Sequence, residues 1–147
     1  MISPPGGPPL LSVTLDIGGF VHTDLDVGPK QAFQNPTYGS TLDIDYAGNK
    51  PSNIVRSGNH DTLPKVALSS NFGTSWSVNY GASPSIGPGK VAISADGDTV
   101  FLVSSTNGPL VSKHTSTFTA VSSLPSGSVI TSDKRNNTVF YGGSAGA

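Results

Sequence analysis

The chain has 147 residues, the length of a single domain, and only 12% of them are charged, with a net charge of −1. Because no basic face is available to gather phosphates, neither nucleic acid nor a membrane is an expected partner. The absence of cysteine excludes a thiolate nucleophile, a disulfide scaffold and a cysteine zinc site. The 18 glycines and 12 prolines, among many Ser, Thr, Asn and Val, favour short strands joined by tight turns.

No segment has a helical period, and short apolar runs bounded by Gly, Pro, Asn or Ser predict an all-β chain. Residues 1–9, rich in proline and glycine and without the basic and apolar runs of a signal peptide, are predicted to be a cut linker. The predicted strands are, in chain order, Leu10–Ile17, Gly19–Leu25, Thr41–Ala47, Asn53–Gly58, Lys65–Ser70, Ser75–Asn79, Lys90–Ala95, Thr99–Ser104, Leu110–Lys113, Phe118–Val121, Val129–Ser132 and Thr138–Gly142.

The strands repeat as hairpins, each a hydrophobic strand, a turn built on Asp, Gly or Asn, and a second hydrophobic strand. Three copies span residues 42–58, 91–104 and 129–143, and a further hairpin follows each of the first two. Equivalent positions in successive copies are separated by the ~40–45 residues of a four-stranded propeller blade, which favours a propeller over an immunoglobulin-like sandwich.

The repeat predicts a partial β-propeller over residues 10–147, with four-stranded antiparallel blades. It contains the outer half of one blade, two whole blades and the inner half of a fourth, about three blades in all. These blade portions are residues 10–25, 41–80, 90–121 and 128–145. Since a propeller needs at least ~4 blades to close, the chain is interpreted as an excerpt of a longer domain.

The hairpin at residues 69–76 resembles the Asp-box pattern S-x-D-x-G-x-T-W, with Asn71 in place of Asp and Ser75 in place of Thr. A short Asx side chain can cap N–H groups within a turn, and Gly73 permits a positive φ. Trp76 is expected to pack against the neighbouring sheet. We interpret this hairpin as a feature of the fold rather than as a ligand site.

The segment Pro9–Phe20 reads P-L-L-S-x-x-x-D-I-G-G-F and is followed by H-x-D-L-D at residues 22–26. In both stretches the chain resembles the second propeller of the family 74 glycoside hydrolases, the xyloglucanases and oligoxyloglucan reducing-end-specific cellobiohydrolases. The resemblance continues, in order, to Ser132-Asp133-Lys134. It implies a fragment of a seven-bladed propeller from a secreted, extracellular enzyme.

The resemblance also implies a mechanism. Family 74 enzymes hydrolyse β-1,4-glucosidic bonds with inversion, using one aspartate from each of two propellers, and Asp16 falls on the position of the general acid in the second. An inverting enzyme needs two carboxyl groups ~6.5–9.5 Å apart, which two domains across a cleft can supply. The implied partners are xyloglucan, or a related β-glucan, and the missing first propeller; no cofactor or metal is implied.

Gly18, Gly19 and Phe20 are candidate substrate-binding residues, because glycines let a sugar approach the backbone and Phe20 could stack on it. Leu15 stands where the family usually has Gly, which predicts a less free backbone before Asp16. From local sequence alone, Asp16 is also compatible with an ordinary turn aspartate.

Other residues carry weaker signals. The carboxylates Asp24, Asp26, Asp43 and Asp45 are interpreted as solvated or turn-capping, and His22, His60 and His114 lack a zinc-ligand spacing, so no metal site is predicted. The alternative function is a non-catalytic carbohydrate-binding or interaction propeller. A sialidase-like propeller is disfavoured because the chain has only two arginines, Arg56 and Arg135.

Overall fold

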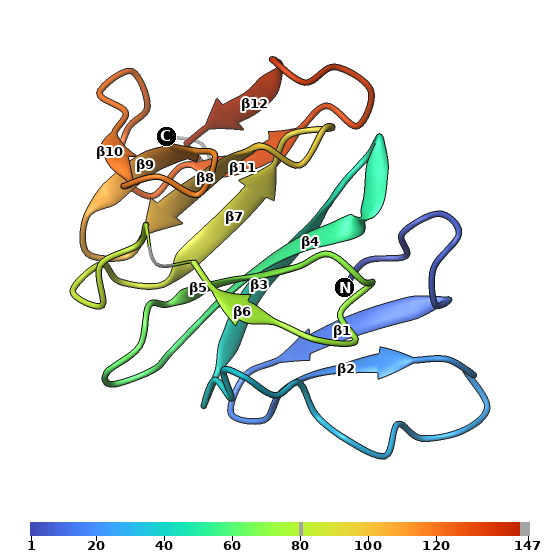
Figure 1. The fold of residues 1–147 in the computed structure, drawn as a ribbon. Helices are drawn as coiled ribbons and strands as arrows, with labels where there is room; N and C mark the ends of the chain where they lie inside the picture. Colours follow the sequence, from blue (N-terminus) through green and yellow to red (C-terminus); the bar gives the residue numbers. More distant parts are fainter. Residues whose placement is uncertain (80, 145–147) are drawn as a thin grey trace.

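The structure is a computed structural model that describes residues 1–79 and 81–144. Every regular element in these residues is a β-strand, which confirms the predicted all-β class (Figure 1). Tyr80 and residues 145–147, at the ends of two predicted blade portions, lie outside the described residues. The strands are β1 (Leu10–Thr14), β2 (Gly18–His22), β3 (Thr41–Ala47), β4 (Lys50–Gly58), β5 (Val66–Ser69), β6 (Ser77–Val78), β7 (Gly89–Ile93), β8 (Thr99–Ser104), β9 (Gly108–Lys113), β10 (Thr119–Ala120), β11 (Val129–Ser132) and β12 (Phe140–Gly143).

The strands form four antiparallel sheets. Two are four-stranded meanders, β3-β4-β5-β6 and β7-β8-β9-β10, and two are hairpins, β1-β2 and β11-β12. The first strands of successive sheets contact one another, β3 against β7 and β7 against β11, and the sheets fan out from them (Figure 1). The arrangement is that of propeller blades, and two of the predicted four-stranded blades are complete.

The first sheet is wider than its two strands. Ile2 forms an antiparallel bridge with Leu11 of β1, in which the Ile2 nitrogen lies 3.0 Å from the Leu11 carbonyl oxygen and the Leu11 nitrogen 2.8 Å from that of Ile2. Ala32 forms a similar bridge with Phe20 of β2. The hairpin therefore has a bridging residue on both sides, and Ile2, which makes one of these bridges, belongs to the segment predicted as a linker. A bridge of one residue leaves no alternating pattern in the sequence, and the Pro-rich composition around Ile2 is not typical of a strand.

The core lies between the sheets, because each strand sends alternate side chains to its two faces. On β4, Ile54 packs toward the first sheet, in a cluster that includes Leu11, whereas Val55 packs toward the third sheet, in a cluster that includes Ile93. A third, smaller cluster joins the last two sheets. The described residues include no helix long and apolar enough to cross a membrane.

Carboxylates of β3 bind the inner edge of the next sheet. Asp43 Oδ2 accepts the Val91 N–H and Asp45 Oδ2 accepts the Ile93 N–H, each at 3.0 Å. Lys134 Nζ lies 2.6 Å from Asp45 Oδ1. Burial raises the pKa of the Asp43 carboxyl, an effect that the Val91 N–H opposes. The interpretation of these two carboxylates as solvated or turn-capping was wrong, because they satisfy strand-edge N–H groups that have no neighbouring strand.

The Asx-containing hairpin closes through its side chains. Ser69 Oγ accepts the Gly73 N–H at 2.9 Å, and Asn71 Oδ1 accepts the Ser75 N–H at 3.0 Å. Trp76 is buried, with its ring centroid 5.0 Å from that of Phe33. Asn71 therefore caps the turn from within, as an Asx residue at this position is expected to do.

Arg56 is a fully buried cation between the first two sheets. Its guanidinium carbon lies 5.1, 4.6 and 4.5 Å from the ring centroids of Phe33, Tyr38 and Trp76, and Nη2 donates to the Pro36 carbonyl oxygen at 2.6 Å. Burial lowers the pKa of Arg56 to about 10, so that the side chain stays charged near neutral pH. Its three aromatic faces replace part of the solvation that burial removes.

Candidate functional site

The candidate catalytic residue Asp16 lies on an exposed hairpin turn. Strand β1 ends at Thr14 and β2 begins at Gly18, so residues 15–17 form the connection. The prediction of strand through Ile17 was wrong, since Leu15 and Ile17 are 66% and 60% exposed. Asp16 has a left-handed backbone with φ of 68°, a conformation that Asp tolerates better than most residues. The turn thus presents a carboxylate to solvent between two exposed apolar side chains.

Leu15 itself does not strain this turn. The residues with positive φ in the described chain include Asp16 and Gly18 but not Leu15. The substitution of Leu for the family's usual glycine therefore falls at a position whose backbone any residue can adopt. Leu15 is therefore unstrained, and the predicted loss of backbone freedom relative to glycine stays a prediction.

Gly18 and Gly19 are both buried, and internal packing explains their identity. Gly18 has φ of 97°, which favours glycine. A Cβ on Gly19 would lie 2.5 Å from the Ser12 carbonyl oxygen and 2.6 Å from the Phe33 ring. Both are needed by the fold whether or not a sugar contacts them, and their contact with substrate stays a prediction.

Phe20 is half-buried on β2, with its ring edge-on to the His22 ring at 6.4 Å between centroids. His22 Nε2 lies 2.8 Å from Ser12 Oγ on the paired strand β1. Phe20 therefore packs beside His22 on the hairpin, and its stacking on a sugar stays a prediction.

Ser40 holds Asp16 in place. Its hydroxyl oxygen accepts the Asp16 N–H at 3.0 Å, and the hydroxyl donates to Asp16 Oδ1 at 3.1 Å. Ser40 directly precedes β3, so these bonds join the first sheet to the second. Sequence reasoning missed Ser40, since the two residues are 24 positions apart and no motif links them.

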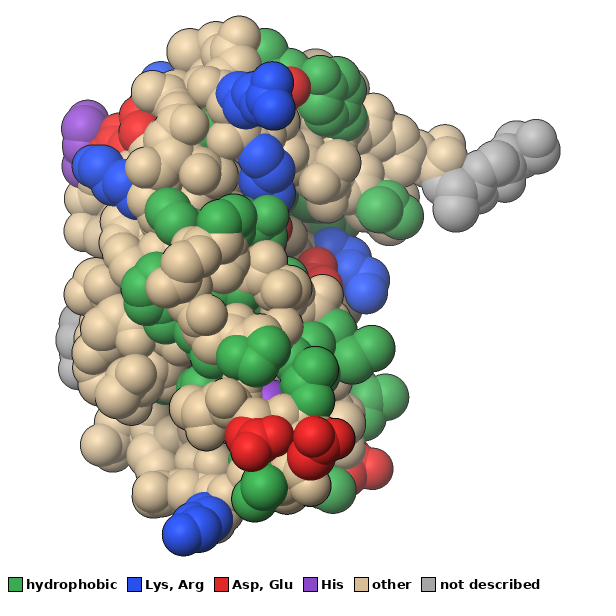
Figure 2. All heavy atoms as spheres, turned by 90° about the vertical axis from the view of Figure 1, so that its right-hand side faces the viewer, with side chains coloured by type: hydrophobic (Ala, Val, Ile, Leu, Met, Phe, Trp, Pro, Cys, Tyr) green, Lys and Arg blue, Asp and Glu red, His purple; other side chains and the backbone are tan. Residues whose placement is uncertain are grey.

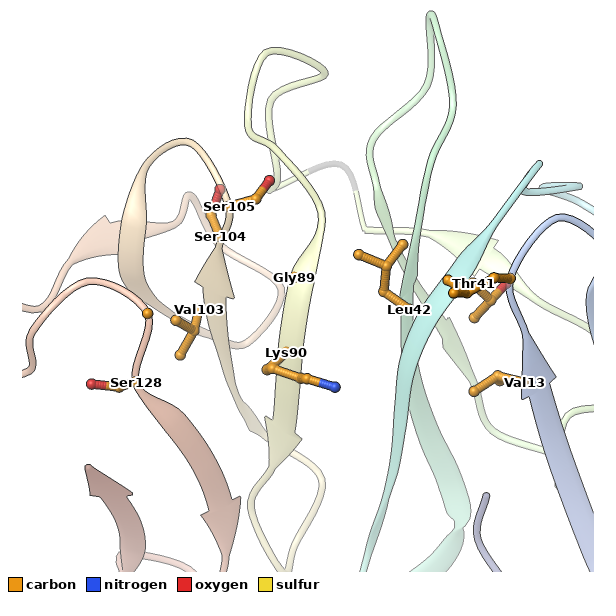
Figure 3. Close-up of a pocket in the computed structure, with 11 residues that line it drawn as sticks. Val13, Thr41, Leu42, Gly89, Lys90, Val103, Ser104, Ser105 and Ser128 are labelled. Atoms are coloured by element: carbon orange, nitrogen blue, oxygen red, sulfur yellow. The ribbon is translucent and has the colours of Figure 1, made fainter. Parts of the chain in front are cut away.

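A hollow of about 440 Å³ lies at the end of the molecule where β3 and β7 begin. Figure 3 shows Val13 and Leu42 on one side of it and Lys90 extending from β7. Leu15 and Thr41 also line the hollow, and Asp16 and Ser40 are their chain neighbours. Neither Asp16 nor Ser40 is itself a lining residue. The full lining is Val13, Leu15, Thr41, Leu42, Gly89, Lys90, Val103, Ser104, Ser105, Gly127 and Ser128.

The other carboxylates near the hairpin do not join this site. Asp24 and Asp26 follow the far end of β2, where Asp24 Oδ1 accepts the Asp26 N–H at 2.9 Å. They belong to a loop with the exposed Leu25 and Val27. Figure 2 shows acidic and apolar side chains gathered in the lower part of one face of the molecule. Asp16 is thus separated from them by the length of the strand.

The histidines are dispersed in the structure. His60 Nδ1 accepts the N–H groups of Thr62 and Leu63, and His114 pairs with Asp98 on an exposed turn. Within residues 1–79 and 81–144, no three His, Asp or Glu side chains are grouped closely enough to hold a metal ion.

Comparison with known proteins places the chain among glycoside hydrolases. No family model matches it. It is 42% identical over 147 residues to a xyloglucanase of Hypocrea jecorina and 37% identical over 153 residues to one of Paenibacillus sp.. The alignments cover 98% and 99% of this chain but 18% and 15% of those proteins. The chain therefore spans less than a fifth of the length of these relatives.

Solved structures agree in fold. A family 74 xyloglucanase from Xanthomonas campestris superposes with a TM-score of 0.82 at 28% identity, covering 90% of this chain and 20% of that one. The chain belongs to glycoside hydrolase family 74. A second member, from Niastella koreensis, superposes with a TM-score of 0.78 at 30% identity, and the match covers 95% of this chain and 20% of the Niastella chain. The family 74 relationship thus extends over nearly every described blade portion.

Proposed function

We propose that the chain is part of an extracellular, inverting xyloglucan hydrolase and that Asp16 is its general acid. The observation that carries the proposal is that Asp16 is an exposed carboxylate on a turn held by Ser40, next in sequence to Leu15, which lines the largely apolar hollow. Xyloglucanases are the relatives that match nearly the whole chain, which supports xyloglucan as the substrate. No cofactor is required for this chemistry.

The catalytic base would come from outside this chain. None of the residues that line the hollow in the described part of the chain is Asp or Glu. Asp43 and Asp45 are held by backbone N–H groups of β7, which makes them poor bases for a water molecule. A first propeller facing this one across a cleft would supply the second carboxylate at the ~6.5–9.5 Å that inversion requires. The chain would then be a piece of the second, seven-bladed propeller.

In the reaction, Asp16 protonates the glycosidic oxygen as its bond to the sugar breaks, while the base takes a proton from the attacking water. Leu15 and Ile17 flank the carboxyl group, and a bound polysaccharide would exclude water from all three. Gly18, Gly19 and Phe20, directly after the turn, would shape the adjacent sugar contact.

The test is Asp16→Asn in the polypeptide that carries both propellers, with release of reducing ends from xyloglucan as the assay. General acid catalysis contributes roughly 10²- to 10⁴-fold, so we expect a loss of that order with binding of the polysaccharide retained. Asp61→Asn is the matched control, since Asp61 is exposed and outside the hollow. Unchanged hydrolysis by Asp16→Asn would refute the assignment. Binding of xyloglucan without any hydrolysis by the unaltered protein would support the non-catalytic alternative.

A further inference from the structure

We propose that Ser40 is a positioning residue that determines which oxygen of Asp16 delivers the proton. The inference rests on the proposed function of Asp16 and adds a residue to that site. Two hydrogen bonds join Ser40 to Asp16, one from the Asp16 N–H and one to the Asp16 carboxyl group, so Ser40 fixes both the turn and the carboxyl group.

The hydroxyl of Ser40 has one proton and uses it on Asp16 Oδ1, at 3.1 Å. Its oxygen is occupied by the Asp16 N–H, at 3.0 Å, which orients that proton toward the carboxyl group. An oxygen that accepts a hydrogen bond is the natural carbonyl oxygen of a protonated carboxyl group. Oδ2 makes no hydrogen bond within the described residues, so it is the oxygen left to carry the proton.

Ser40 is itself anchored to a rigid sheet. Its carbonyl oxygen accepts the Asn59 N–H at 2.8 Å, and the Gly39 N–H donates to the Asn59 carbonyl oxygen at 3.2 Å. The next residue, Thr41, is 2% exposed and begins β3. Asp16, on an exposed turn, has no comparable packing of its own. Ser40 therefore transfers the rigidity of the second sheet to a carboxyl group that would otherwise rotate freely.

The proton transfer needs no reactant besides substrate and water. The proton on Asp16 Oδ2 passes to the glycosidic oxygen, which keeps the electron pair of the breaking bond to the sugar carbon. Water adds to that carbon from the opposite face and gives its proton to the base of the other propeller. Asp16 becomes a carboxylate, whose Oδ1 still accepts the Ser40 hydroxyl, so the same bond stabilises the product state.

The experiment compares Ser40→Ala, Ser40→Thr and Asp16→Asn in the polypeptide that carries both propellers. Each variant is assayed on two substrates with the same xyloglucan oligosaccharide as glycone. One has a sugar leaving group, which needs protonation, and the other a nitrophenyl leaving group, which departs as an anion. Ser123→Ala is the matched control, because Ser123 is exposed and makes no side-chain hydrogen bond in the described structure.

We expect Ser40→Ala to lower kcat on the sugar leaving group by about 10- to 100-fold with little change in KM, since misplacing a catalytic group costs rate rather than binding. The loss on the nitrophenyl substrate should be about threefold or less, and Ser40→Thr, which keeps the hydroxyl, should restore most of the rate. Asp16→Asn should show the same dependence on the leaving group, more strongly.

An equal loss on both substrates would overturn the proposal, because it indicates a general disturbance of the site. Wild-type activity of Ser40→Ala, with Asp16→Asn inactive on the sugar leaving group, would overturn the role of Ser40 and leave that of Asp16 standing. Wild-type activity of Asp16→Asn would remove the proposed function and the role of Ser40 together.

Discussion

Removal of the Asp45 carboxylate should destabilise the fold more than any exposed substitution. Asp45 Oδ1 accepts from Lys134 Nζ at 2.6 Å, and Oδ2 accepts from the Ile93 N–H at 3.0 Å and from Ser132 Oγ at 3.2 Å. The carboxylate of β3 thus binds both β7 and the sheet that begins with β11. Asp45→Ala would leave a strand-edge N–H and an ammonium group without this partner.

The magnitude follows from the burial of the pair. The Asp45 side chain is 14% exposed and that of Lys134 is 33% exposed, so solvent screens the pair only in part. A fully buried pair loses about 3–5 kcal/mol when one partner is removed, and an exposed pair about 0.2–1 kcal/mol. We expect Asp45→Ala to cost about 3 kcal/mol, and Asp45→Asn, which retains an acceptor for Ile93, about half of that.

Thermal unfolding followed by circular dichroism measures the effect. A loss of about 3 kcal/mol corresponds to a fall in Tm of roughly 6–12 °C for a domain of this size. Asp61→Ala is the control, since Asp61 is exposed, and a change within about 0.5 kcal/mol is expected there. A fall for Asp45→Ala no larger than that of the control would show that the inter-sheet bonds contribute nothing, and the reasoning would fail.

Three further predictions concern stability. Arg56→Met removes a buried charge but keeps the volume of the side chain, so it should change the free energy of unfolding by less than about 1 kcal/mol. Arg56→Ala also leaves a cavity and should cost about 3 kcal/mol. Chemical denaturation measures both, and a larger loss for Arg56→Met than for Arg56→Ala would contradict this account. Gly19→Ala should cost about 1–3 kcal/mol, because its Cβ would meet Ser12 and Phe33, and an unchanged Tm would show that the hairpin relaxes easily. A hydrogen bond from a serine hydroxyl lowers the pKa of Asp96, so its stabilisation is present above the unfolded pKa and is lost as pH falls through the folded one. Asp96→Asn should therefore flatten the loss of Tm on acidification below about pH 4, and a Tm profile parallel to that of the unaltered chain would refute the link.

Several strands lie where the sequence predicts them. The bounds of β3, β8 and β11 agree with those predicted, because each is a run of residues that favour strands and ends at a clear turn signal. The strand predicted to reach Ile17 stops at Thr14, since apolar residues in an exposed turn look the same as strand residues in a one-dimensional pattern. The pairing of Ile2 with Leu11 was missed for a different reason, because a bridge of one residue in a Pro-rich segment leaves no alternating pattern.

The sequence by itself determined the all-β class and the repeat of hairpins, because both are written in the order and spacing of apolar and turn residues. The resemblance of residues 9–26 to family 74 indicated the family and Asp16 as the residue to examine. The tertiary structure alone decided what surrounds Asp16 and what Asp45 does. Ser40 lies 24 residues from Asp16, and Lys134 lies 89 residues from Asp45. Such contacts depend on how the sheets pack against one another. The sequence around a serine or a lysine does not indicate which distant residue this packing places beside it.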